Sequence, residues 1–82
     1  MERIKNIDEI KQYTNETLDC FISLANGIAR SSKEITYNKE INTFTIWHSI
    51  SDTSEELTEK EFKATNIFEA LQNKNLYKYK LK

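Results

Sequence analysis

Apolar and polar residues alternate over one long stretch of the chain, from Ile41 to Ile50. Successive side chains of a β-strand point to opposite faces, so this stretch predicts a strand with one apolar face and one threonine-rich face. We expect it to be the central strand of the fold. The apolar face holds Phe44, Ile46, His48 and Ile50, and the other face holds Ile41, Thr43, Thr45, Trp47 and Ser49.

A short β-like segment, Ile35 to Tyr37, precedes this stretch and is separated from it by polar turn residues. The two segments predict a β-hairpin. We expect Asn38 to pair with Ile41 and Ile35 with Phe44, which places Ile35 and Tyr37 on the apolar face and Thr36 on the threonine face. A register displaced by one residue would bury the threonines instead, and the hydrophobic pattern disfavours it.

The N-terminal third of the chain predicts a long amphipathic helix. Asn6 and Glu9 have the spacing of a capping box, so the helix should begin at Ile7. We expect it to end between Asn26 and Arg30, with Gly27, the only glycine, as its left-handed cap. The apolar stripe consists of Ile7, Ile10, Leu18, Phe21, Ile22, Ala25 and Ile28.

A polar surface loop is expected from Ser51 to Glu56, followed by a second helix. Thr58 and Glu61 form a capping box, and Leu57 and Phe62 occupy the positions of a hydrophobic staple. The apolar stripe of this helix continues through Leu71, and an asparagine at 73 or 75 should end it. Asn66 can restart the helix, which leaves a kink near Thr65 as an alternative.

Aromatic and charged residues alternate in the last six positions, where Tyr77, Tyr79 and Leu81 interleave with three lysines. This pattern predicts a final strand. The expected fold is therefore one α+β domain over 1–82, a two-layer αββαβ arrangement with a small three-stranded, mainly antiparallel sheet. Both helices should cover one face and leave the other open.

Composition and charge narrow the function classes. The 82 residues carry a net charge of −1, which argues against bulk binding of nucleic acid. No apolar run approaches the ~20 residues needed to span a bilayer, so we expect no membrane association. Cys20 is the only cysteine, which fits a reducing, cytoplasmic location.

Few residues of this chain are candidates for catalysis or metal binding. One cysteine and one histidine are too few for a structural zinc site, and a single glycine offers no phosphate-binding loop. We expect Cys20 to be a small buried residue within the first helix and His48 to lie at the margin of the core. The sequence therefore predicts a protein without catalytic residues, metal or cofactor.

Candidate partner-binding residues fall into three groups. Trp47 shares the threonine face, and tryptophan is enriched at binding hot spots, although a covering segment would make it part of the core. The acidic run from Asp52 to Glu61 suits either a docking surface or a solvated helix start. The C-terminal lysines suit phosphate contacts or protection of an edge strand. The candidates are Thr43, Thr45, Trp47, Asp52, Glu55, Glu56, Lys78 and Lys80.

These observations predict a small non-enzymatic protein-binding domain, monomeric or weakly dimeric. Abundant Ile, Asn and Lys are typical of AT-rich genes, which points to a phage-type mobile element and to an inhibitor or regulator of a host enzyme or defence complex. One alternative is a nucleic-acid-binding protein that uses the Lys/Tyr strand. A second alternative is a subunit or dimerisation module of a larger complex.

Overall fold

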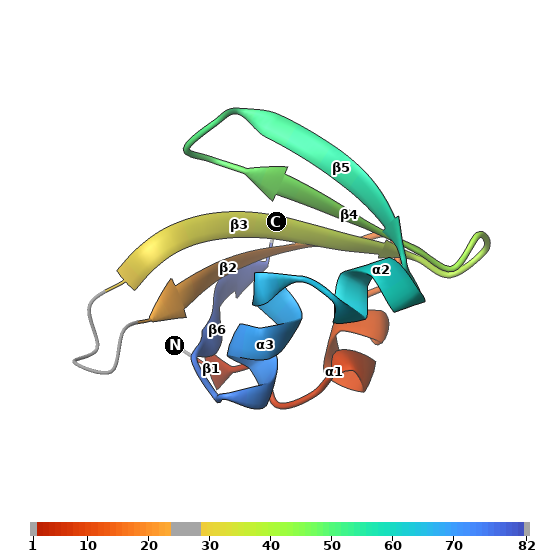
Figure 1. The fold of residues 1–82 in the computed structure, drawn as a ribbon. Helices are drawn as coiled ribbons and strands as arrows, with labels where there is room; N and C mark the ends of the chain where they lie inside the picture. The colour runs from red at the N-terminus through yellow and green to blue at the C-terminus, as the bar shows by residue number, and fades with distance from the viewer. Residues whose placement is uncertain (1, 24–28, 82) are drawn as a thin grey trace.

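The computed structural model describes residues 2–23 and 29–81, with the backbone alone at 29–31 and 79–81. Its main element is an antiparallel six-stranded sheet with the order β1-β6-β2-β3-β4-β5 (Figure 1). The strands are β1 (Glu2–Arg3), β2 (Thr17–Ser23), β3 (Ala29–Asn38), β4 (Thr43–His48), β5 (Thr53–Thr58) and β6 (Leu76–Leu81). The helices are α1 (Ile7–Lys11), α2 (Glu59–Lys63) and α3 (Asn66–Gln72).

The three short helices pack on one face of the sheet and bury a single core (Figure 1). Phe62 of α2 stacks on Phe44 of β4, with ring centroids 4.4 Å apart and an interplanar angle of 12°. Ile35, Ile46 and Phe44 are fully buried beneath the helices. The α+β class agrees with the sequence, but the predicted αββαβ arrangement with a three-stranded sheet is wrong, because three further strands join the sheet.

The predicted first helix is mostly a strand. α1 contains only Ile7–Lys11, and Thr17–Ser23 forms β2, which pairs with β3 on one side and β6 on the other. Both faces of β2 are buried, because Leu18 and Phe21, which point to opposite faces, are 1% and 7% exposed. A strand buried on both faces loses the alternation of polar and apolar residues, and its apolar residues then also fit a helical stripe.

The N-terminal cap of α1 was predicted correctly in part. The Asn6 side chain accepts a hydrogen bond from the Glu9 backbone N–H at 3.0 Å. The Glu9 carboxylate, however, accepts from the backbone N–H of Lys5 rather than from that of Asn6. The predicted cap at Gly27 lies outside the described residues.

β4 is shorter than the predicted strand and is not central, since it lies next to the edge strand β5. Ile41 and Ile50 belong to turns and are 62% and 81% exposed. The turns before and after β4 end at Asn42 and Asp52, with φ of 51° and 52°. Asparagine and aspartate tolerate this left-handed conformation, so these two residues set the strand ends.

The β3–β4 register differs from the predicted one by two residues. Ile35 pairs with Ile46, and Tyr37 pairs with Phe44. A shift of two residues leaves every side chain on its original face, since the side-chain period of a strand is two. The predicted faces are therefore confirmed although the predicted partners are wrong.

The expected loop from Ser51 to Glu56 is mainly a strand. β5 begins at Thr53 and forms a hairpin with β4 through the turn 49–52. Its residues are exposed except for the half-buried Leu57, because nothing in the described chain pairs with its outer side. A strand so poor in apolar residues gives no hydrophobic pattern by which it can be recognised.

The predicted second helix is divided in two. The capping box of Thr58 and Glu61 begins α2, as expected. The helical run breaks at Ala64 and resumes at Asn66, where the Thr65 side chain caps α3 by accepting from Phe68 N–H. The alternative of a kink near Thr65 is thus confirmed, and Asn73 ends α3 as predicted. β6 is also confirmed as a strand, but it lies between β1 and β2 instead of at an edge.

Candidate partner-binding surface

The β4–β5 hairpin gathers most of the predicted partner-binding residues on the face opposite the helices. The register pairs Trp47 with Ser54 and Thr45 with Glu56, so these side chains share one face. Figure 1 shows the helices on the other side of the hairpin. We define the Trp47 surface by six residues: Thr43, Thr45 and Trp47 of β4, Asp52 of the turn, and Ser54 and Glu56 of β5.

Trp47 has a defined orientation on this surface. Its indole Nε1 donates a hydrogen bond to Asp52 Oδ1 at 3.2 Å, and the side chain is half-buried. A tryptophan N–H needs an acceptor when it is partly removed from water, and Asp52 supplies that acceptor from within the turn. The ring is thus held by its hairpin while part of it stays open to solvent.

The Trp47 surface is acidic. Glu34 of β3 borders this surface, because it pairs with Trp47 across the β3–β4 ladder and points to the same face as Glu56. Asp52 adds a third carboxylate at the end of the hairpin. The other strand positions of this face between 32 and 58 are serine, threonine, asparagine or tryptophan, without lysine or arginine. The face therefore favours a positively charged partner.

Glu55 was predicted with this group but lies on the opposite face of the hairpin. Its Oε2 is 2.7 Å from His48 Nε2. Both residues line a groove of about 810 Å³ between the sheet and α3, whose floor includes Ile46 and Ile67. Neighbouring residues of a strand point to opposite faces, so Glu55 and Glu56 serve different surfaces.

Lys78 and Lys80 are separated from the Trp47 surface, since β2 and β3 lie between β6 and β4. Lys78 Nζ lies 2.7 Å from Glu2 Oε2 and donates to the Tyr13 hydroxyl at 3.0 Å. The hydrogen bond to Glu2 is the main reason why the pKa of Lys78 is raised. Lys80 pairs with Asp19 in the backbone ladder, and its side chain lies outside the described residues.

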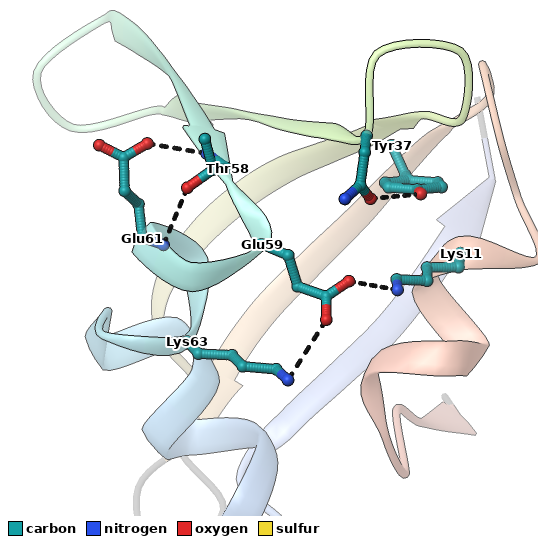
Figure 2. A network of polar contacts seen from close by, with 7 residues as sticks. Lys11, Tyr37, Thr58, Glu59, Glu61 and Lys63 are labelled. Carbon is teal, nitrogen blue, oxygen red and sulfur yellow. Dashed lines mark hydrogen bonds and ion pairs between the residues drawn. The ribbon is translucent and has the colours of Figure 1, made fainter.

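A polar network fixes the end of β5 where it enters α2 (Figure 2). Thr58 N–H donates to Glu61 Oε1 at 2.8 Å, and Glu61 N–H donates to Thr58 Oγ1 at 3.2 Å. The hydrogen bond from the Thr58 backbone lowers the pKa of Glu61. Glu59 forms ion pairs with Lys11 of α1 and with Lys63 of α2. This network ties the last residue of β5 to α2, and Glu59 ties α2 to α1.

Ser54 belongs to the Trp47 surface but was not among the predicted residues. The sequence placed it in a loop, and it lacks the size or charge that marks a binding residue. Its only sequence signal is its position between Thr53 and Thr58, two β-branched residues that are favoured in strands.

The environment of the Cys20 thiol opposes nucleophilic catalysis. Burial is the main reason why the pKa of the Cys20 thiol is raised to about 12, so the thiol stays protonated at neutral pH. Cys20 is buried as predicted, although in a strand rather than a helix. His48 contacts Glu55 on the hairpin instead. Among residues 2–23 and 29–81, no three His, Cys, Asp or Glu side chains are grouped to hold a metal ion.

Comparison with known proteins finds no matching family, no matching curated protein and no matching solved structure. Within the described ranges, no helix has both the length and the apolar character needed to cross a membrane. The geometry of the chain itself is therefore the basis for a functional proposal.

Proposed function

We propose that this chain is a non-enzymatic protein-binding domain that uses the Trp47 surface to contact a basic region of its partner. The observation that carries the proposal is that one hairpin holds an oriented, half-buried tryptophan among hydroxyl side chains and carboxylates. In the wider proposal, the partner is a host enzyme or defence complex, and the chain is its phage-type inhibitor or regulator.

The physical properties of the surface suit this role. Tryptophan contributes a large contact area with few rotatable bonds, so ordering it on binding costs little entropy. The hydrogen bond from Trp47 to Asp52 reduces that cost further, because the ring is already oriented. Carboxylates around the ring accelerate encounter with a basic partner and can compete with nucleic acid for it.

The alternative role in nucleic-acid binding gains no support from these contacts. Lys78 is paired with Glu2 and Tyr13 and is only 15% exposed at its side chain. The Trp47 surface carries acidic groups that repel phosphates. The remaining alternative, a subunit of a larger complex, uses the same surface and differs only in its partner.

The proposal can be tested by affinity capture from a lysate of a low-GC bacterium. Wild-type protein is compared with Trp47→Ala and Glu56→Lys, and with Glu40→Lys as a control for charge. Glu40 is exposed in the turn that precedes β4, and its side chain is outside the Trp47 surface. We expect a retained protein that is lost with the first two variants and kept with the control. Equal retention by all four proteins contradicts the proposal.

A further inference from the structure

The two edges of the sheet differ in how much backbone they expose. β1 forms one edge and contains only Glu2 and Arg3. β5 forms the other edge with six residues, and its register with β4 runs from Thr53 to Thr58 without a bulge. Proteins usually protect a long edge with charged residues, proline or a bulge, and β5 has two glutamates but neither proline nor a bulge. β5 is therefore a template on which a further strand can pair.

The capping box shows which backbone groups of β5 point outward. Thr58 N–H donates to the Glu61 carboxylate, so it is directed away from its ladder partner Thr43. Outward and inward groups alternate along an antiparallel ladder. Ser54 and Glu56 therefore also direct their N–H and C=O groups away from β4. Their side chains lie on the Trp47 surface, so the exposed edge and this surface are continuous.

The charges of β5 decide which strand fits. Glu55 and Glu56 are both exposed and point to opposite faces. Outward residues pair with outward residues in an antiparallel ladder, so the self-pairings with the longest overlap set Glu55 against its own copy, or Glu56 against its own copy. Like charges directly opposite each other are destabilising, so a second copy of this chain is a poor occupant. A segment with basic residues at these positions turns both repulsions into attractions.

We propose that β5 binds an extended basic segment of the partner as an added antiparallel strand, through the outward N–H and C=O groups of Ser54 and Glu56. Strand addition obtains its affinity from main-chain hydrogen bonds and its specificity from side chains. The residue opposite Glu56 lies on the same face as Trp47, and the residue opposite Glu55 lies above the groove beside α3. This inference rests on the proposed function and specifies its binding mode.

A synthetic peptide provides the probe for this binding mode. The capped peptide Thr-Val-Lys-Lys-Thr-Val sets its two lysines opposite Glu56 and Glu55 when it pairs antiparallel to β5. Titration is followed by the amide resonances of isotope-labelled full-length protein. We expect saturable binding with a Kd below about 1 mM. Slowed amide exchange should appear at Ser54 and Glu56, because their N–H groups gain acceptors.

Substitutions at Ser54 separate the backbone contribution from the charge. Ser54→Pro removes one outward N–H without changing the charge, and proline is tolerated where an edge N–H faces solvent. Ser54→Ala is the matched control, since it keeps the N–H and removes only the hydroxyl. We expect Ser54→Pro to bind the peptide about tenfold more weakly than Ser54→Ala. Unchanged core amide resonances verify that both variants are folded.

A second measurement covers the case in which Ser54→Pro does not fold. The same peptide with N-methyl groups on the lysine and threonine that face Glu56 and Ser54 should lose binding to the wild-type protein. Equal binding of both peptides, no saturable binding, or shifts confined to the groove beside α3 overturn the inference. Loss of captured protein with Trp47→Ala but not with Ser54→Pro would leave the proposed function standing and refute strand addition alone.

Discussion

The two faces of β4 have opposite roles although they belong to one six-residue strand. Phe44 and Ile46 are fully buried against α2 and the neighbouring strands. Thr43, Thr45 and Trp47 alternate with them and remain partly exposed on the other face. One strand thus supplies both the centre of the core and the proposed binding surface. Stability and binding can therefore be changed separately by substituting adjacent residues.

The core face should show the largest effect on stability. Phe44→Ala removes a ring that is 0% exposed and stacked on Phe62, so it loses transfer free energy and leaves a cavity. We expect a loss of about 3 to 5 kcal/mol in the free energy of unfolding. Urea denaturation followed by circular dichroism measures it. A loss below about 1 kcal/mol would show that the two faces of β4 contribute similarly to stability.

Substitution on the binding face of β4 should reduce partner affinity more than it reduces stability. Trp47→Ala removes a half-buried side chain that faces solvent, and we expect it to cost about 1 kcal/mol of stability. Affinity for the captured partner should fall by about 2 kcal/mol, as at a hot spot. Trp47 fluorescence in the wild type should be red-shifted and open to a neutral quencher. A blue-shifted, unquenched spectrum would mean that this face is covered.

The buried thiol of Cys20 in β2 should make the free energy of unfolding depend on pH. Its thiol has an ordinary pKa of 9.0, and burial raises this to about 12 in the folded state. Between these values the unfolded chain releases a proton that the folded chain keeps, so stability falls as pH rises from 9 to 12. We expect the slope for wild type to exceed that for Cys20→Ala by up to about 1.4 kcal/mol per pH unit. Equal slopes would show that the thiol is accessible to water.

Thr58 lies where β5 ends and α2 begins, and its replacement should have the smallest effect. Thr58→Ala removes the hydroxyl that accepts from Glu61 N–H. We expect a loss of about 1 kcal/mol in the free energy of unfolding. Lys60→Ala is a suitable control, since Lys60 is exposed on the same helix and makes no capping contact. Equal midpoints for the two variants would contradict the role of the cap.

Local sequence signals were sufficient to predict the structure wherever the interacting residues are close in the sequence. Thr58 and Glu61 are three residues apart, and the predicted capping box is present. The faces of β4 followed from alternation alone, since the period of a strand does not depend on its neighbours. The candidate residues Thr43, Thr45 and Trp47 therefore lie together as predicted. Asp52 and Glu56 joined them only through the β4–β5 hairpin.

Pairing between strands that are distant in the sequence accounts for the main errors in the predicted fold. β2 lies between β3 and β6 and is buried on both faces, and Phe21 interrupts the alternation of its residues, so its pattern also fits a helix. β5 is polar except for Leu57, because it is an exposed edge, and its pattern also fits a loop. Position in the sheet determines both patterns, and position is not encoded in the local sequence of either strand. The same reason separates Lys78 from the site, since strand order places β2 and β3 between them.

The amino-acid sequence by itself determined the capping box of α2, the two faces of β4, the final strand and the scarcity of cysteine and histidine. These properties depend on residue type and on spacings of a few residues. The tertiary structure decided that the sheet has six strands, that β5 forms an exposed edge, and that Glu55 and Glu56 serve different surfaces. Strand order and register depend on contacts between distant segments, because burying the core requires them to pair.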